Sequence, residues 1–372
     1  MGLKTALILS GGGARGAYQV GVLKGLAEIL PEKKKSPFQI LSGVSAGAIN
    51  CASLASEIEH FSNAVEKLIY LWSQISSDQV FKTDFLSLNK FSLGLFGERK
   101  LNSVLETAPL RDLINEHCNF DKIKKNLEQE IIDSVIITAN NYGHSSAISF
   151  IQTNENNIAW KESRRQAEHA IINADHIMAS SAIPMLFPPI RIGNQFYGDG
   201  CVRNNTPCSP SIRMGAEKLF VIGVRQQLGA ETSTTIGTET EKAPSMIRIL
   251  NTLLNAVLLD SVEQDVMRIQ RINQLTHQTE GKKKNSSGLK EIPALCISPS
   301  QDIGEIARSH AHRLPRLLRM TISAFGSLDD ASEILSYLLF EPNFCKQLIE
   351  MGYSDAMDSK SQIKKFFQEG DS

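Results

Sequence analysis

Residues 38–54 read FQILSGVSAGAINCASL, and this stretch decides the fold. It begins with an apolar run that reads as a short strand, and residues 46–54 are compatible with a helix. Between them, Gly43-x-Ser45-x-Gly47 is typical of a nucleophile elbow, a sharp turn from strand to helix. Side chains on the flanking positions would collide with such a turn, so both must be glycine. The Ser45 hydroxyl would then project above a sheet at a helix N-terminus, where the helix dipole favours negative charge. A helix N-terminus packed closely on a sheet gives the same small residues, so the pentapeptide leaves both interpretations open.

A second strand-to-helix turn lies near the start of the chain. Leu7–Leu9 reads as an apolar strand, SGGGARG follows at residues 10–16, and an amphipathic run comes next. A glycine-rich turn of this kind directs several unpaired backbone N–H groups at one spot and forms an anion cradle. The turn matches the dinucleotide-binding fingerprint, but that site needs an acidic residue at the end of the second strand, where residues 42–45 read SGVS. The other interpretation is an oxyanion hole for a tetrahedral acyl intermediate.

A third motif is YGDGCVRNNTP at residues 197–207. The preceding segment, residues 190–196, predicts a hairpin whose turn is Gly193-Asn194. Asp199 then lies at a strand end between two glycines that allow a partner to approach closely. An Asp-Gly pair is usually only a turn, but the three motifs together are far more specific than any one alone.

The three motifs resemble those of the patatin-like phospholipase family. That family carries a Gly-Gly-Gly-x-Arg/Lys-Gly loop, a Gly-x-Ser-x-Gly nucleophile and an Asp-Gly-Gly or Asp-Gly-Ala motif in this order, here at residues 11–16, 43–47 and 199–201. Residues 179–189, ASSAIPMLFPP, also resemble a family segment. The similarity extends from about residue 5 to about residue 225, and residues 335–340 and 351–353 show weaker similarity to bacterial members of the family. Cys201 departs from the pattern and suggests a tighter or oxidisable site.

The resemblance implies a three-layer α/β/α fold with a central, mostly parallel sheet and a C-terminal helical extension. We expect a catalytic α/β domain over residues 1–225 and a loop-rich, mainly helical extension over residues 226–372 that packs on it.

The resemblance also implies a serine-dependent lipid acyl hydrolase of the phospholipase A or lysophospholipase type, with a Ser–Asp dyad and no histidine. Ser45 would attack the ester carbonyl and Asp199 would act as the base. The other site residues that it implies are the oxyanion-hole set Gly11, Gly12, Gly13, Ala14, Arg15 and Gly16 and the flanking set Gly43, Gly47, Gly200 and Cys201. It calls for no cofactor and no metal. A lipid-binding scaffold that has lost turnover is the alternative.

The histidines agree with such a dyad, because none of the eight lies in a constrained turn next to the motifs. The chain order of an α/β-hydrolase triad leaves only His277, His310 and His312 after Asp199, in polar or helical surroundings. His176, just before the family-like segment, is the one to check for proximity to the site. With an ordinary Asp pKa of about 3.9, we expect no inflection of kcat/KM between roughly pH 6 and 7.

We expect a cytoplasmic enzyme, peripheral to a membrane or in transient contact with its surface. The 372 residues are 42% hydrophobic and carry a formal net charge of -1, which gives no general attraction to nucleic acid or to an anionic membrane. No apolar run approaches the roughly 20 residues that span a bilayer, and we expect no cleavable signal peptide. The six scattered cysteines favour reduced thiols. The expected partner is a lipid ester substrate, without an obligate protein partner.

Strand and helix signals alternate up to about residue 225, and strands are predicted at 6–9, 39–41, 134–139, 147–151, 190–192, 219–224 and 294–297. Polar stretches at 226–244 and 276–290 predict loops, and the second contains the lysine triplet 282–284, which is either a loop tip or a contact with a membrane surface. Helices are expected from 247 and again after 297. Residues 81–96 are rich in Phe and Leu, which fits a helical cap on the core or a lid that forms an acyl-chain groove.

Overall fold

The computed structural model describes residues 3–30, 36–82, 103–155, 158, 160–162, 164–226, 243, 245–258, 261–279, 290–325 and 327–368. The strands are β1 (Thr5–Leu9), β2 (Ile40–Val44), β3 (Ser134–Asn141), β4 (Ser146–Thr153), β5 (Lys161–Glu162), β6 (Arg165–His169), β7 (Ile190–Ile192), β8 (Gln195–Asp199), β9 (Lys218–Ile222) and β10 (Ala294–Ile297). The α-helices are α1 (Gly16–Ile29), α2 (Ala46–Glu57), α3 (Phe61–Gln74), α4 (Ser77–Val80), α6 (Ala108–His117), α7 (Phe120–Glu128), α8 (Ala174–Ser180), α9 (Ser209–Arg213), α10 (Met246–Leu258), α11 (Ser261–Thr279), α12 (Ile303–Ser309), α13 (Arg316–Phe325), α14 (Ser332–Leu338), α15 (Pro342–Asp358) and α16 (Lys360–Gln368). Short 3-10 helices are η1 (Gly13–Arg15), η2 (Ile58–His60), η3 (Gly200–Val202), η4 (Ala311–Arg313) and η5 (Asp329–Ala331).

The described strands form one sheet in the order β10-β9-β1-β2-β3-β4-β6-β5, and β8 pairs with both β3 and β7. The five strands from β10 to β3 are parallel neighbours, whereas β4 and β8 run antiparallel to β3. Every strand predicted from the sequence is present, and the β7–β8 pairing confirms the predicted hairpin. The sequence does not predict β5 and β6, because β6 reads RQAEH and lacks the apolar alternation of a half-buried strand.

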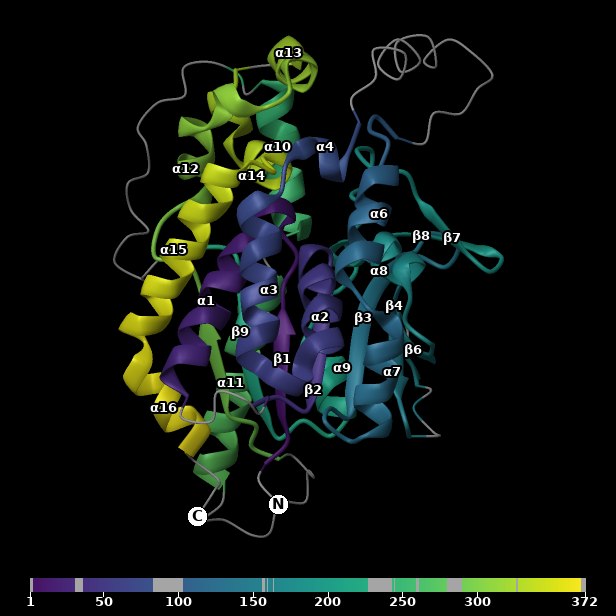
Figure 1. Cartoon of the computed structure of the whole chain (residues 1–372), viewed down its shortest axis with the longest axis vertical. Coiled ribbons are helices and arrows are strands. Elements are labelled where there is room, and N and C mark those ends of the chain that lie inside the picture. The colour runs from purple at the N-terminus through teal and green to yellow at the C-terminus, as the bar shows by residue number, and fades with distance from the viewer. Residues whose placement is uncertain are drawn as a thin grey trace.

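Alternation along the central strands divides the side chains between two cores. On β1, Leu7 and Leu9 belong to the larger core with α1, α2, α3 and α15, whereas Ala6 and Ile8 belong to the smaller core with residues of α11. Successive strand residues point to opposite faces, so a sheet covered on both sides needs apolar residues at both. Figure 1 shows α2 and α3 in front of β1 and β2, with α1 beside α3. The predicted three-layer α/β/α fold is therefore confirmed.

The residues beyond 225 are joined to this sheet and its core. β10 extends the sheet beside β9, and α15 packs so closely on α1 that a Cβ at Gly21 would lie 2.0 Å from the carbonyl oxygen of Ile349. The helices α10, α12, α13 and α14 gather at the upper end of the molecule in Figure 1. The mainly helical character of this region is confirmed, although α11 continues to Thr279, into the stretch predicted as a loop from residue 276. The domain boundary at residue 225 stays a prediction.

Two features singled out in the sequence fall mostly or wholly outside the described residues. These are the Phe-rich segment, from residue 83 onward, and the lysine triplet 282–284. Phe81, at the start of the Phe-rich segment, is described, and its ring packs against those of Phe187 and Phe340. This residue therefore belongs to the core.

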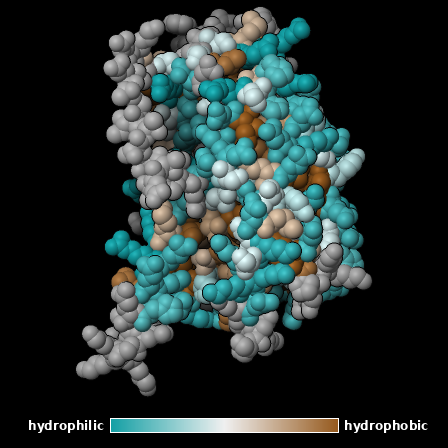
Figure 2. Space-filling view, turned by 90° about the vertical axis from the view of Figure 1, so that its left-hand side faces the viewer, coloured by the Kyte–Doolittle hydropathy of each residue, from teal (hydrophilic) through white to brown (hydrophobic). Residues whose placement is uncertain are grey.

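Within the described ranges, no helix is long and apolar enough to cross a bilayer. Figure 2 shows the side of the molecule that carries α12 and α15, where the described surface is mainly hydrophilic and hydrophobic residues occur in separate small areas.

Candidate active site

Ser45 occupies a strained turn between β2 and α2. Its φ is 55° and its ψ is -125°, a combination that residues other than glycine rarely adopt. A Cβ at Gly43 would lie 2.2 Å from the carbonyl oxygen of Gly47, and a Cβ at Gly47 would lie 2.2 Å from that of Leu9. Only glycine fits at either position. Strain of this kind costs about 1–3 kcal/mol and persists where the surroundings fix the backbone.

The end of α8 supplies those surroundings. Ser180 Oγ accepts a hydrogen bond from the Ser45 N–H (2.9 Å) and donates one to the carbonyl oxygen of Thr138 (2.6 Å). Ser181 Oγ donates to the Ser45 carbonyl oxygen (3.1 Å). The two serines thus hold both polar groups of the Ser45 backbone. Their segment resembles the family in sequence, but this role is invisible there because the contact spans 135 residues.

Asp199 ends β8 and lies against Ser45. Its Oδ2 accepts a hydrogen bond from Ser45 Oγ at 2.7 Å, and its Oδ1 accepts one from the Cys201 N–H at 2.9 Å. Both side chains are buried, with exposed fractions of 3% for Ser45 and 1% for Asp199. A Cβ at Gly200 would lie 2.1 Å from the Thr138 carbonyl oxygen, so glycine lets the chain after Asp199 turn against β3.

Strand pairing brings these two residues together across 154 positions of sequence. Because β4 pairs with the whole of one edge of β3, β2 and the antiparallel β8 follow one another along the other edge. Val44 at the end of β2 pairs with Thr138, and Asp199 at the end of β8 pairs with the next residue, Ala139. Neighbouring strands lie about 5 Å apart, so adjacent positions on β3 place the elbow and the carboxylate at the same end of the sheet.

Burial changes the acid–base chemistry expected of Asp199. Loss of hydration raises the pKa of its carboxyl to about 6, and hydrogen bonds from Ser45 and from Cys201 offset only part of that increase. The expectation of an ordinary pKa near 3.9 is therefore wrong, and the acid limb of kcat/KM is now predicted to bend near pH 6. A carboxylate with a higher pKa is a stronger base, so the correction makes Asp199 better suited to accept a proton from Ser45.

The glycine-rich turn after β1 lies beside Ser45. A Cβ at Gly11 would be 2.9 Å from the Ser45 Cβ. Within the turn, the N–H of Arg15 donates to the Gly12 carbonyl oxygen at 3.2 Å, and the Gly16 N–H donates to the carbonyls of Gly13 and Ala14. Among described residues, the N–H groups of Gly12 and Gly13 have no protein acceptor, so they remain available to an anion.

The side chain of Arg15 does not contact Ser45 or Asp199 in the described structure. It is buried, with 2% exposed, and binds α14 and the carbonyl oxygen of Val224 instead. Ala14 is likewise buried in the core. Of the six residues predicted for an oxyanion hole, Gly12 and Gly13 therefore offer free donors, while Arg15 and Gly16 use their N–H groups inside the turn.

Cys201 stands where the family motif has Gly or Ala. Its Sγ would be only 2.4 Å from a Cβ at Gly11, so the larger side chain is accommodated by the glycine opposite. Burial, together with the nearby charge of Asp199, raises the pKa of the Cys201 thiol well above its usual value. The thiol stays neutral, which favours a packing role over the reactivity of a thiolate.

The histidines lie away from the candidate dyad. Within the described structure, all eight are placed and none is hydrogen-bonded to Ser45 or Asp199. The ring of His176 packs edge-on against Phe150 and hydrogen-bonds Asn173 at the start of α8. Burial lowers the pKa of His176 to about 4, so this residue has a capping role in the fold.

The turn with free N–H groups, the buried serine and the carboxylate with a raised pKa form one constellation. A nucleophile hydrogen-bonded to a base, next to donors for a developing negative charge, is the arrangement that acyl transfer requires.

The chain is similar in sequence to several known proteins. The family model described as Patatin-like phospholipase matches residues 7–212. A probable lipid hydrolase, 463L of Invertebrate iridescent virus 6, is 27% identical over 213 residues, which cover 57% of this chain and 64% of that protein. A cGAMP-activated phospholipase of Pseudomonas aeruginosa (strain BWHPSA011 / Pa011) is 26% identical over 201 residues, which cover 54% of this chain and 53% of that protein. The matched part of the chain therefore spans less than two thirds of each relative.

Among solved structures, the crystal structure of VipD from Legionella pneumophila aligns with 97% of this chain and 67% of that chain, at 12% identity and a TM-score of 0.37. A likeness this weak carries no argument. The family match, by contrast, covers more than half of the chain and includes the glycine-rich turn, the elbow and Asp199. The chain therefore belongs to the patatin-like phospholipase family.

Proposed function

We propose that this protein is a serine-dependent lipid acyl hydrolase that cleaves carboxylic esters of phospholipids or lysophospholipids. The observation that carries the proposal is the 2.7 Å hydrogen bond from Ser45 Oγ to Asp199 Oδ2, beside a turn with free N–H groups. The lipid hydrolase and phospholipase named among the relatives support the substrate class.

The proposed reaction uses groups of this chain only. Ser45 Oγ attacks the ester carbonyl carbon while its proton passes to Asp199 Oδ2, and the N–H groups of Gly12 and Gly13 stabilise the oxyanion. Asp199 then gives the proton to the leaving alkoxide, and the acyl-enzyme forms. Asp199 next takes a proton from water, which attacks the acyl carbonyl, and returns it to Ser45 Oγ as the fatty acid leaves.

Two other functions make different predictions. A scaffold that has lost turnover would bind lipid without hydrolysis, and a p-nitrophenyl ester assay separates it from an enzyme. A nucleotide-binding protein would be stabilised against heat by NAD or ATP. The structure gives no support to the latter, since β2 ends at Val44 and leads into Ser45, where dinucleotide binding needs an acidic residue.

Gly12→Ala should lower kcat by up to about 100- to 1000-fold, the cost of one lost donor, and leave KM nearly unchanged, because the oxyanion exists only in the transition state. Alanine keeps the N–H, but its Cβ would lie 2.7 Å from a methyl group of the buried Val224 and 3.2 Å from the Arg15 Cβ, so the turn must shift and carry its N–H groups away from the oxyanion. Gly13→Ala is a poorer test, since Gly13 has a φ of 57° and a Cβ there would lie 2.2 Å from the Tyr337 carbonyl oxygen. Steady-state kinetics with a melting curve check the effect, and a raised KM at unchanged kcat would point to ground-state binding instead.

An apolar stripe on α10 fits contact with a lipid surface, as a cytoplasmic protein at the membrane periphery would need. Met246, Ile249, Leu253 and Val257 follow one another at helical spacing and are 69%, 50%, 59% and 39% exposed. α10 contacts η3, which carries Cys201 beside Asp199, and it also contacts α13. The helix that carries the stripe therefore packs beside the candidate site.

The charge around α13 favours an anionic lipid surface. Residues 306–328 include four arginines and no acidic residue in a chain of net charge -1. Arg313 and Arg316 are exposed and form no ion pair with a described carboxylate. Met320 on the same helix is 69% exposed. Exposed apolar residues next to unpaired cations suit the surface of a bilayer that contains anionic phospholipid.

Leu253→Glu should weaken binding to phosphatidylglycerol vesicles roughly tenfold, because it replaces an inserted apolar side chain by a charge that the lipid repels. Hydrolysis of a soluble p-nitrophenyl ester should be unchanged. Met267→Glu on α11 is the matched control, since Met267 is also 59% exposed. Vesicle co-sedimentation measures the effect, and equal losses in both variants would argue against the α10 surface.

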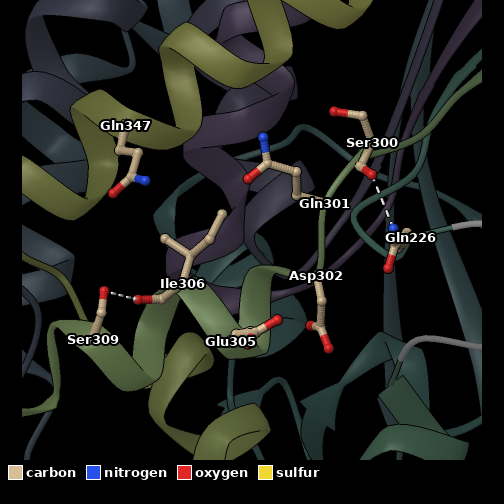
Figure 3. Close-up of a pocket in the computed structure, with 8 residues that line it drawn as sticks. All are labelled: Gln226, Ser300, Gln301, Asp302, Glu305, Ile306, Ser309 and Gln347. Atoms are coloured by element: carbon tan, nitrogen blue, oxygen red, sulfur yellow. Dashed lines mark hydrogen bonds between the residues drawn. The ribbon is translucent and has the colours of Figure 1, made fainter.

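Activation by cGAMP, which the name of the Pseudomonas relative states, has no counterpart in the cavity of Figure 3. That cavity of about 400 Å³ is lined by Gln226, Ser300, Gln301, Asp302, Glu305, Ile306, Ser309 and Gln347. Its lining residues include two carboxylates and no cationic side chain, whereas phosphate groups bind best to cations and aligned N–H donors. This cavity is therefore a poor match for cGAMP.

A further inference from the structure

Arg15, next to the free N–H groups, is bound by a helix far away in sequence. Its Nε donates to Ser336 Oγ at 2.8 Å, its Nη2 forms an ion pair with Glu333, and its guanidinium lies 5.1 Å from the centre of the Tyr337 ring. These three partners belong to α14. A buried guanidinium cannot lose its charge, so it requires such partners in the folded state.

A second contact joins the same two elements. A Cβ at Gly13 would lie 2.2 Å from the Tyr337 carbonyl oxygen, so the backbone of the turn rests directly on the end of α14. The Val224 carbonyl oxygen accepts from Arg15 Nη1 at 3.3 Å on another side. The turn is thus fixed through both its backbone and its one charged side chain.

α14 itself is fixed by other helices of the C-terminal region. The Ile334 N–H donates to Asn251 Oδ1 of α10 at 3.1 Å. The Glu333 Oε1 lies over α12, 3.0 Å from where a Cβ at Gly304 would be. The position of the Glu333 carboxylate is therefore set by α12 and α14 together.

We propose that Glu333 is a positioning residue for the oxyanion hole, and that the C-terminal helices thereby complete the active site. Glu333 orients Arg15, and Arg15 holds the turn so that the N–H groups of Gly12 and Gly13 face the developing charge. A donor displaced by a fraction of an ångström loses much of its effect on the transition state and little of its effect on substrate binding. This inference rests on the function proposed above.

Glu333→Gln is the test, because glutamine keeps the shape of the side chain and removes its charge. Activity per active site is measured by titration with a fluorophosphonate probe, followed by kcat and KM on a p-nitrophenyl ester. We expect kcat per labelled site to fall about 10- to 100-fold, KM to change less than about twofold, and labelling to be slower but complete. A role only in folding would instead reduce the labelled fraction and leave kcat per labelled site at the wild-type value.

Two further variants make the result decisive. Glu350→Gln on α15 removes an exposed glutamate of the same C-terminal region and should keep wild-type kcat. Ser336→Ala removes one hydrogen bond to Arg15 and should lower kcat a few-fold, which provides a readout if Glu333→Gln does not fold. Wild-type kcat per labelled site in both the Glu333 and Ser336 variants would overturn the positioning role. Absence of labelling at Ser45 in the wild type would overturn the proposed function itself, which keeps the two failures apart.

Discussion

Ser45→Ala should reduce ester hydrolysis by on the order of 10⁴-fold or more, since removal of a nucleophile leaves only binding and the oxyanion hole. The substitution deletes one oxygen, whose described hydrogen bond goes to Asp199. The turn is held by bonds from Ser180 and Ser181 to the Ser45 backbone, and alanine keeps that backbone. The fold should therefore remain, as a melting curve would show.

A fluorophosphonate probe identifies the nucleophile directly. It should label the wild type at Ser45 and leave Ser45→Ala unlabelled. Ser211→Ala is the matched control, because Ser211 is a fully buried serine on α9 whose hydroxyl has no described partner, and this variant should keep both labelling and activity. Labelling at another serine, or turnover that persists in Ser45→Ala, would remove Ser45 from the mechanism.

The local parts of the site can be predicted from the sequence because each depends on residues close together in the chain. The glycines of the elbow predict a turn that only glycine can make. The apolar residues at 6–9 predict a buried strand, and those at 190–192 predict one strand of a hairpin. The candidate pair of Ser45 and Asp199 came from a resemblance, since no spacing rule connects residues 154 positions apart.

The remaining features depend on three-dimensional surroundings. The raised pKa of Asp199 arises from burial by elements throughout the chain. A sequence pattern does not show how far a carboxylate is shielded from water in the folded protein. Arg15 belongs to the family-like turn, but its partner Glu333 is 318 residues away and lies in a segment without a motif. β6 is missed because polar residues occupy a strand near the end of the sheet.

Asp199→Asn should eliminate turnover, because an amide cannot accept the proton of Ser45 at neutral pH. Single replacements of His144, His176, His277, His310 and His312 should each leave most of the activity, since none of these residues is hydrogen-bonded to the pair in the described structure.

The pH profile of kcat/KM tests the same assignment on protein that is still active, namely the wild type and the histidine variants. The pKa of Asp199 is raised to about 6, so the carboxylate is protonated, and the base lost, as pH falls through that value. The acid limb should therefore bend near pH 6 in the wild type and in every histidine variant. A bend that disappears in one histidine variant would falsify the dyad and favour a triad.

Stability gives an independent check with a definite sign. Because the pKa of Asp199 rises from an ordinary 3.8 to about 6 in the folded protein, the ionised carboxylate disfavours folding. This penalty is absent below about pH 4, grows as pH rises toward 6 and is complete above it. Asparagine can keep the hydrogen bond from Cys201 and avoids the buried charge. Asp199→Asn should therefore raise the melting temperature more at pH 8 than at pH 5. The gain in the free energy of unfolding should be larger at pH 8 by on the order of 1–3 kcal/mol. If the variant is less stable than the wild type at pH 8, the Asp199 carboxylate is not desolvated and its pKa is not raised. It would then lack the higher basicity that suits it to accept the proton of Ser45.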